Sequence, residues 1–446
     1  MSQDGLPQPQ RMIAFTVLAI AVAMTVVDAA IVNVALPTIA GDLAVRPELA
    51  IWVVNAYQLA VTVSLLPLAS LGDILGYKRV WFAGLVLFTL ASLACALSNS
   101  LLLLVVARLL QGFGAAGVMS VNIAFVRSLY PRAQLGAGVA NVAFVVAVAS
   151  ASSPSLAAAI LAVAPWRWLF YINVPLGLLA LAFAWRVLPE TPRVNQRLDA
   201  LSVILNAATF GLLITGVDAL GDPDWTRAGC ELVGAGVAAA LLTWRQFGLA
   251  LPVLPIDLLA RPVFALSMAS SVSSFSAQSL AFIALPFYFQ QVQHLTPTAI
   301  GLLMTPWPAA TALIAPISGR LADRFQPALL GSAGLVLMSA GLLALALMPA
   351  DAHFADVAWR LALAGFGFGF FQSPNNKMII SSAPAGRGGA ASGLQSTGRL
   401  TGQTLGAAML AVIFARGVGE AMPVALTLAA ALALCGSVAS GFRRMD

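Results

Sequence analysis

The feature that most constrains this chain is its number of apolar segments long enough to cross a lipid bilayer. Crossing about 30 Å of hydrocarbon takes about 20 residues of helix. Such segments begin near Met12, Glu48, Val80, Leu101, Leu135, Trp166, Ala200, Ala228, Pro262, Pro297, Ala328, Phe354, Gly389 and Ala421. Only 9% of the residues are charged, against about 25% in a soluble globule. The sequence therefore predicts an all-α polytopic membrane protein with 14 transmembrane helices.

The distribution of positive charge predicts the orientation of these helices. If the amino terminus is cytoplasmic, the inner loops and tails hold sixteen lysines and arginines, against five in the outer loops. Positively charged loops stay on the cytoplasmic side of a membrane. We therefore expect both termini in the cytoplasm and the chain in a bacterial-type cytoplasmic (inner) membrane. The basic residues are spread over short loops, which argues against nucleic acid as a partner.

One glycine cluster resembles a nucleotide-binding loop. In RLLQGFGAAG, Gly112, Gly114 and Gly117 have the G-x-G-x-x-G spacing. A dinucleotide-binding turn follows a strand, opens a helix and precedes an acidic residue about 20 positions later. Here the cluster lies within an apolar run, and the next acidic residue is Glu190. We interpret the glycines as sites of close helix packing and expect neither a nucleotide nor a cofactor.

The cysteines and histidines do not indicate a metal site. Cys95, Cys230 and Cys435 lie in separate apolar segments, and His294 and His353 lie in predicted outer loops. A zinc or catalytic site would require further ligands at short spacing. We expect no metal and no catalytic residues.

A repeated pattern suggests two related halves. The segments LGDILGYKR and GRLADRFQP each place an aspartate, Asp73 or Asp323, just after an apolar helix and close to basic residues. Each follows the second helix of a six-helix set, and duplicated bundles are typical of transporters. We therefore expect a six-helix bundle over residues 1–188, two inserted helices and linkers over 189–261, and a second six-helix bundle over 262–446.

Several longer motifs together resemble the major facilitator superfamily, specifically its fourteen-span drug:proton antiporter branch. They are DAAIVNVALP at Asp28, LVVARLLQGFGAAG around Arg108, WRWLFYINVPLG and LPFYFQQVQHLTP. The resemblance implies transport by alternating access between the two bundles. It also implies a gate formed by the charged loop residues Asp73, Lys78, Arg79, Asp323 and Arg324, with Asp73 facing the amino end of the helix that begins near Gly389. The antiporter-type motif of that branch, usually Gly-Pro, corresponds here to Ser153 and Pro154.

Asp28 is the one acidic residue deep within a predicted span of either six-helix bundle, and such a charge usually marks function. At 1.5 Å per residue, Asp28 and Arg108 differ in depth by about one helical turn, so direct or water-mediated pairing is possible. Burial would raise the pKa of the carboxyl group, whereas a nearby arginine would lower it. Asp28 then either exchanges protons, in competition with a cationic substrate, or remains ionised in a structural pair with Arg108.

A set of aromatic and amide side chains in the second bundle predicts the substrate cavity. Trp307 lies at mid-span between Pro306 and Pro308, which should interrupt the helix. Aromatic faces attract organic cations, although similar faces are often plain packing surfaces. Arg399 is a further intramembrane charge without an obvious partner. The predicted cavity residues are Trp307, Phe275, Gln278, Phe282, Phe371, Gln372, Asn375 and Arg399.

These observations favour proton-coupled export of hydrophobic, cationic small molecules, a multidrug efflux function, with protons and membrane lipids as the other partners. An exporter of one metabolite, antibiotic or lipid-like compound is the alternative within the transporter class. A non-transporting membrane sensor or an intramembrane enzyme is the alternative from another class.

Overall fold

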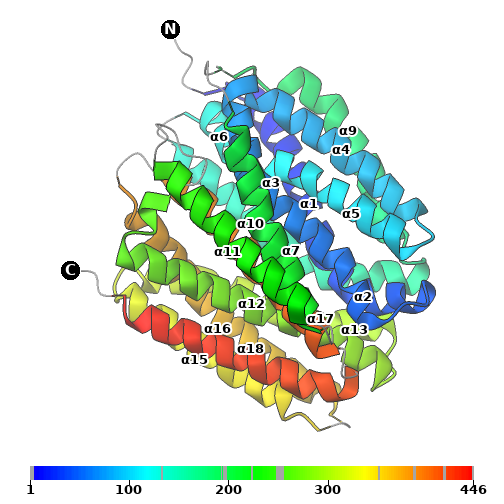
Figure 1. Ribbon diagram of the computed structural model, residues 1–446. Coiled ribbons are helices and arrows are strands. Elements are labelled where there is room, and N and C mark those ends of the chain that lie inside the picture. The colour runs from blue at the N-terminus through cyan, green and yellow to red at the C-terminus, as the bar shows by residue number, and fades with distance from the viewer. Residues whose placement is uncertain are drawn as a thin grey trace.

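The computed structural model of the chain is built entirely of helices (Figure 1). The structure describes residues 5–131, 134–191, 193, 198–221, 225–247, 256–349, 352–384, 388–414 and 418–443. The long helices run side by side, and both termini lie at their left-hand ends in Figure 1. We refer to these as the terminal ends and to the others as the far ends.

The first bundle contains six rods of helix, three of which are interrupted. The interruptions follow Ala50, Ser120 and Tyr171. The helices are α1 (Gln10–Asp42), α2 (Pro47–Ala50), α3 (Trp52–Leu75), α4 (Tyr77–Leu97), α5 (Leu101–Ser120), α6 (Asn122–Leu129), α7 (Leu135–Val163), α8 (Trp168–Tyr171) and α9 (Asn173–Val187).

The second bundle repeats this plan. Its second rod is interrupted at Thr305, directly before Pro306, as the two prolines flanking Trp307 predicted. The helices are α12 (Pro262–Gln291), α13 (Pro297–Met304), α14 (Pro306–Leu321), α15 (Pro327–Ala346), α16 (Phe354–Ser381), α17 (Gly388–Phe414) and α18 (Val418–Gly441).

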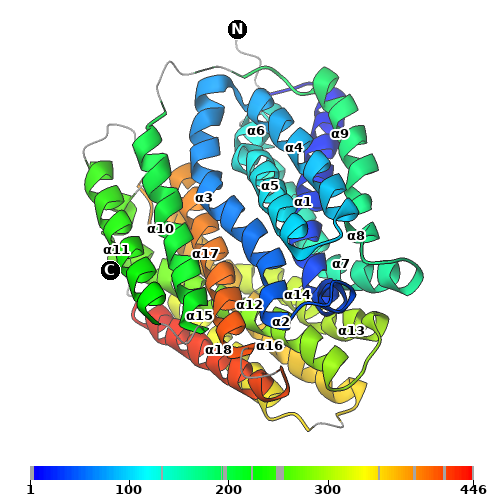
Figure 2. The same cartoon turned by 45° about the vertical axis from the view of Figure 1, so that its right-hand side comes forward.

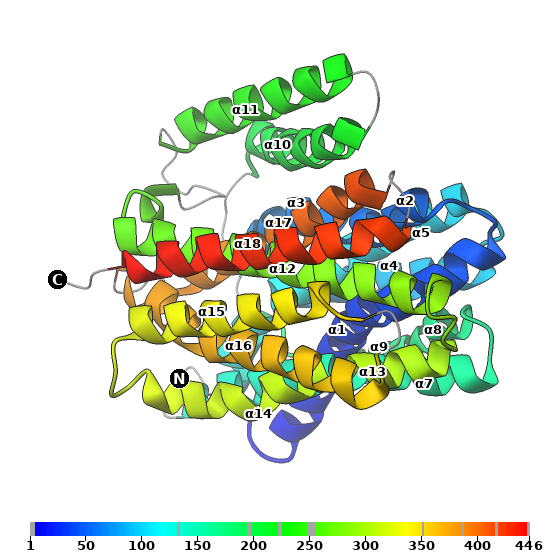
Figure 3. The same cartoon turned by 90° about the horizontal axis from the view of Figure 1, so that it is seen from below.

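A hairpin between the bundles is formed by α10 (Ala200–Asp218) and α11 (Trp225–Phe247), with short 3₁₀ turns at Ala219–Gly221 and Ile256–Leu258. Figure 3 shows the hairpin standing apart from the rest, with α11 outermost. Helix α10 packs against α3 and α17, one helix from each bundle (Figure 2). The Asn206 amide donates to the Val63 carbonyl and the Trp52 indole donates to Asp218, so both hydrogen bonds attach α10 to α3.

The prediction of 14 transmembrane helices is confirmed in part. In the described part of the chain, 12 helices are long and apolar enough to cross a membrane. Helices α11 and α17 are outside that set. Polar content explains this: α11 carries Arg227, Glu231 and Arg245, and α17 carries Arg399 among glutamines, serines and threonines. That these two helices also span the membrane stays a prediction.

Glycines set the closest helix contacts, as the sequence predicted for Gly112, Gly114 and Gly117. A Cβ atom on Gly114 would lie 2.4 Å from the Phe88 amide nitrogen, and one on Gly112 would lie 2.5 Å from the Tyr57 carbonyl oxygen. Any side chain there would push α5 away from α4 and α3. The packing interpretation of this motif is therefore confirmed.

The far ends of the two bundles are packed together. One buried apolar cluster combines Ile31 and Leu36 of α1 with Phe287 of α12 and Leu303 of α13. Thr38 of α1 also donates a hydrogen bond to Gln290 of α12, at 3.3 Å. In this structure the path between the bundles is therefore closed at the far end.

Candidate functional site

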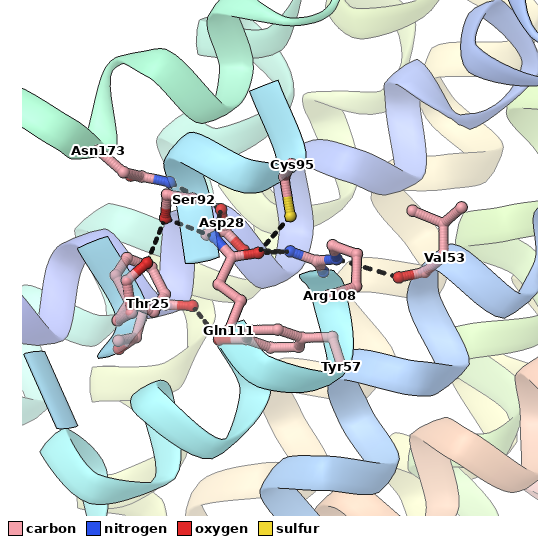
Figure 4. A network of polar contacts seen from close by, with 10 residues as sticks. Thr25, Asp28, Val53, Tyr57, Ser92, Cys95, Arg108, Gln111 and Asn173 are labelled. Atoms are coloured by element: carbon pink, nitrogen blue, oxygen red, sulfur yellow. Dashed lines mark hydrogen bonds and ion pairs between the residues drawn. The ribbon is translucent and has the colours of Figure 1, made fainter. Parts of the chain in front are cut away.

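A dense network of buried polar groups lies in the middle of the first bundle (Figure 4). Five helices supply it, so it forms only when the bundle is assembled. Its members are Asp28 of α1, Tyr57 of α3, Ser92 and Cys95 of α4, Arg108 and Gln111 of α5, and Asn173 of α9.

Asp28 and Arg108 form a direct ion pair at the centre of this network. Arg108 Nη1 lies 2.5 Å from Asp28 Oδ2, and each residue is 1% exposed. Arg108 also donates from Nε to the Val53 carbonyl at 3.0 Å and from Nη1 to Gln111 Oε1 at 2.7 Å. The sequence allowed direct or water-mediated pairing of these two residues, and the structure contains the direct pair.

The second carboxylate oxygen of Asp28 accepts two amide hydrogen bonds. Gln111 Nε2 and Asn173 Nδ2 each donate to Oδ1 at 2.8 Å. Gln111 Nε2 also donates to Ser92 Oγ at 2.8 Å. Three side chains therefore compensate the ionised form of Asp28, which is the condition for keeping a charge in a dry interior.

Aromatic rings cover the guanidinium group. The Arg108 Cζ atom lies 4.2 Å from the centre of the Tyr57 ring and 5.6 Å from that of Phe170. The Tyr57 hydroxyl donates to the Thr25 carbonyl on α1 at 3.1 Å. These rings exclude water from the pair and strengthen its electrostatics.

Asn173, Tyr57 and Ser92 also belong to this site, although the sequence motifs did not predict them there. Asn173 and Gln111 did carry a usable signal, because an amide within an apolar span needs a partner. That the partner is Asp28 depends on how α9 and α4 pack around α1 and α5, and sequence spacing does not determine this.

The predicted aromatic cavity in the second bundle is closed in this structure. Trp307 is 1% exposed, and its ring meets Phe282 edge to face at 5.1 Å. Phe275 packs against Phe368 in the same way at 5.3 Å. Phe371 is fully buried, and Gln278 and Gln372 are half-buried.

Asn375 lies in a different polar cluster of the second bundle. It donates to Ser271 Oγ at 2.7 Å and accepts a hydrogen bond from Arg443. Arg443 also donates to Ser267 and Ser440 and is 2% exposed. The cavity role predicted for Asn375 and its neighbours stays a prediction.

The predicted gate residues lie at the terminal ends of the helices. Asp73 is exposed and accepts a hydrogen bond from the Tyr77 hydroxyl at 2.6 Å. Lys78 donates to the Trp185 carbonyl at 3.0 Å.

In the second bundle, Asp323 pairs with Lys377 at 2.6 Å. Arg324, and Arg79 of the first bundle, are exposed. These contacts lie within single bundles. The predicted contact of Asp73 with the amino end of α17 involves side chains outside the described residues and stays a prediction.

The antiporter-type motif on α7 lies where the two bundles meet. A Cβ atom on Gly301 of α13 would lie 2.6 Å from the Pro154 carbonyl oxygen and from the Ala158 methyl group. Ser155 and Thr305 share a hydrogen bond of 2.9 Å across the same contact. Ser153 instead donates to Ala149 within its own helix. A helix of the other bundle therefore approaches α7 closely at Pro154.

Potential metal ligands are dispersed. In the part of the chain that the structure describes, no group of three His, Cys, Asp or Glu side chains could hold a metal ion.

Comparison with known proteins gives consistent results. The profile of the family described as Major Facilitator Superfamily matches residues 18–407. The chain is 49% identical over 443 residues to the uncharacterized transporter YebQ of Escherichia coli strain K12, covering 99% of this chain and 97% of YebQ.

Two other relatives are more distant, and their names refer to different substrates. The riboflavin transporter RibZ of Clostridioides difficile strain 630 is 30% identical, covering 91% of this chain and 89% of RibZ. The multidrug resistance protein Stp of Mycobacterium tuberculosis strain CDC 1551 / Oshkosh is 31% identical, covering 88% of this chain and 74% of Stp.

A solved structure has the same fold. It is a bacterial homologue of the human lysosomal transporter Spinster, with a TM-score of 0.72 and 15% sequence identity. The alignment covers 99% of this chain and all of that one.

Proposed function

Since this chain belongs to the Major Facilitator Superfamily and is a secondary transporter, not an enzyme, we propose that it exports hydrophobic small molecules in exchange for protons. It would do so by alternating access in a bacterial cytoplasmic membrane, with both termini in the cytoplasm. The family assignment removes the intramembrane enzyme and the non-transporting sensor from the sequence-based alternatives.

The buried pair of Asp28 and Arg108 carries this proposal. Asp28 is enclosed by helices of its own bundle and is 1% exposed, so proton exchange would require those helices to move. Protonation would remove the charge that Arg108 and the two amides compensate, and would weaken the hold of α1 on α5 and α9. Helix α1 also packs against α12 of the other bundle. We propose that the proton state of Asp28 acts on the bundle interface through α1.

Organic cations, the substrate class that sequence favoured, would require two changes from this arrangement. The Phe282 and Trp307 rings would have to separate, and Asp28 would have to exchange Arg108 for the substrate. If the substrate is a cation, it and the proton would therefore compete for the carboxylate of Asp28.

A transporter of one specific compound is the second candidate. The similarity to RibZ favours it, because RibZ is named for a single vitamin. A narrow substrate range would distinguish this candidate from multidrug export.

The proposal is tested with inside-out vesicles and three fluorescent probes of different charge. The probes are ethidium, neutral N-phenylnaphthylamine and anionic anilinonaphthalene sulfonate. We expect accumulation of at least one probe when a pH gradient is imposed, and its collapse when an ionophore removes that gradient. Accumulation that is unchanged without the gradient would contradict proton coupling.

A further inference from the structure

The second bundle contains a charged side chain that the coupling network does not use. Arg399 lies on α17, about 16 Å from the helix start at Gly388 and about 22 Å from its end at Phe414, and is half-buried. Among the described residues it makes no hydrogen bond and no ion pair. A cation at this depth usually has a partner or faces a substrate path.

The other two buried arginines are satisfied. Arg108 has the Asp28 carboxylate, and Arg443 donates to Ser267, Asn375 and Ser440. Arg399 is therefore distinguished by its lack of partners as well as by its depth.

Arg399 lies on the interface between the bundles. Its neighbour Leu400 is buried against Met24, Tyr57 and Val61 of the first bundle. The Tyr57 ring in that cluster also lies 4.2 Å from the Arg108 guanidinium. Tyr57 thus lies beside the proposed proton-coupling pair and in one buried cluster with Leu400, the residue that follows Arg399.

Unsatisfied polar atoms lie on the same helix as Tyr57. Asn55 and Gln58 are one turn apart on one face of α3. Both amide atoms of Asn55 and the side-chain oxygen of Gln58 are buried without a hydrogen-bond partner among the described residues. An amide nitrogen without an acceptor is costly in a dry interior. The Asn55 side chain is therefore able to donate a hydrogen bond to a ligand.

The balance of charge determines which ligand fits. Asp28 is neutralised by Arg108, which leaves the positive charge of Arg399 at the interface. A cationic substrate would be repelled there, whereas an anion would supply the missing partner. Arg presents a fork of N–H donors that matches carboxylate, sulfonate and phosphate oxygens.

We propose that Arg399 binds the acidic group of an amphiphilic, otherwise hydrophobic substrate. This inference rests on the proposed export function and names the substrate class for it. The apolar part of the substrate would lie between the bundles, and its carboxylate, sulfonate or phosphate would pair with Arg399, beside Tyr57.

Binding in lipid nanodiscs tests the assignment with two probes that share one aromatic skeleton. Anilinonaphthalene sulfonate carries an acidic group and N-phenylnaphthylamine does not. Energy transfer from the protein tryptophans reports binding, and empty nanodiscs give the blank. We expect the wild-type protein to prefer the sulfonate by about tenfold or more, since a hydrogen-bonded charge contributes at least that much.

The variants identify the group responsible. We expect Arg399→Gln to weaken sulfonate binding about 10- to 100-fold and to leave the uncharged probe unaffected, while Arg399→Lys keeps part of the preference. Arg443→Gln is the matched control. It removes the other buried arginine that has no carboxylate partner, and it should not change the ratio of the affinities for the two probes. Equal binding of both probes by the wild type, or equal loss of both in Arg399→Gln, would overturn the proposal.

Charge movement in proteoliposomes gives a second test that needs no variant. With one proton per substrate, anion export moves net positive charge inward, whereas export of a monovalent cation is electroneutral. We expect a potassium-diffusion potential to change sulfonate transport at a fixed pH gradient. Potential-independent transport of ethidium with no transport of the sulfonate would contradict the anionic assignment but leave proton-coupled export intact, so the two proposals fail separately.

Discussion

The two bundles use the same packing device but treat buried charge differently. In the first, Arg108 faces the carboxylate of Asp28, whereas in the second, Arg443 is satisfied by hydroxyl, amide and carbonyl groups. Close glycine contacts occur in both: between α4 and α5 at Gly84 and Gly114, and between α15 and α16 at Gly334 and Gly367. The duplicated architecture therefore carries a titratable group in the core of one bundle.

This difference assigns separate tasks to the two bundles. Under the proposed mechanism the first bundle changes its charge when Asp28 binds a proton, whereas Arg443 in the second has neutral partners. The second bundle would respond through the interface, where α12 meets α1 and α17 meets α3.

The largest effect is expected from removing the charged partner of Asp28. Arg108→Gln would leave a buried carboxylate uncompensated, and we expect a loss of about 3–5 kcal/mol in the free energy of unfolding. Reversible SDS titration of the purified protein measures it. The double variant Asp28→Asn/Arg108→Gln should recover more than half of that loss, because neither charge remains. Strictly additive losses would show that the two side chains do not act as a pair.

A smaller effect, equal in the two bundles, is expected from adding a methyl group at a close glycine contact in each. Gly114→Ala and Gly367→Ala each place a methyl group within 2.4 Å of a backbone nitrogen, and we expect each to cost about 1–3 kcal/mol in the same titration. Gly211→Ala is the control, because a Cβ atom there would meet nothing within 4 Å. A cost in one bundle alone would break the proposed equivalence of their packing.

The smallest effect is expected in the hairpin, which belongs to neither bundle. Arg245 donates two hydrogen bonds of 2.8 Å to Asp199 and holds the pKa of that carboxyl group down to about 2. A lowered pKa means that the stabilisation is present above about pH 4 and is lost as the pH falls to about 2. Asp199→Asn should therefore cost about 0.5–1 kcal/mol for this partly exposed pair, equally at pH 5 and pH 8. A cost that changes between those two pH values would contradict the assignment.

Sequence reasoning succeeded where one residue carries its own constraint. Pro306 and Pro308 predicted the break between α13 and α14, and the glycines of α5 predicted close helix contacts. The depths of Asp28 and Arg108 predicted that they could meet, because helical rise converts position into distance.

Sequence reasoning was incomplete where the outcome depends on neighbouring helices. Asn173 reaches Asp28 only because α9 packs beside α1, and Asn375 lies near Arg443 because α16 and α18 both pack against α12 and α15. Gly365 likewise lets α16 close onto the Trp307 backbone, because it has no Cβ atom. These are contacts between distant segments, and sequence spacing carries no direct record of them.

The central claim is that Asp28 couples protons to transport. The most direct test compares accumulation of a probe against its concentration gradient with exchange of the probe across the membrane. We would measure probe accumulation under an imposed pH gradient and probe counterflow without one, in the same proteoliposomes. The matched control is Asp42→Asn, which alters the other acidic residue of α1, paired with Arg167 at the far end. We predict that Asp28→Asn retains counterflow but loses accumulation, Asp28→Glu keeps part of it, and Asp42→Asn behaves like the wild type. Wild-type accumulation by Asp28→Asn would contradict the claim.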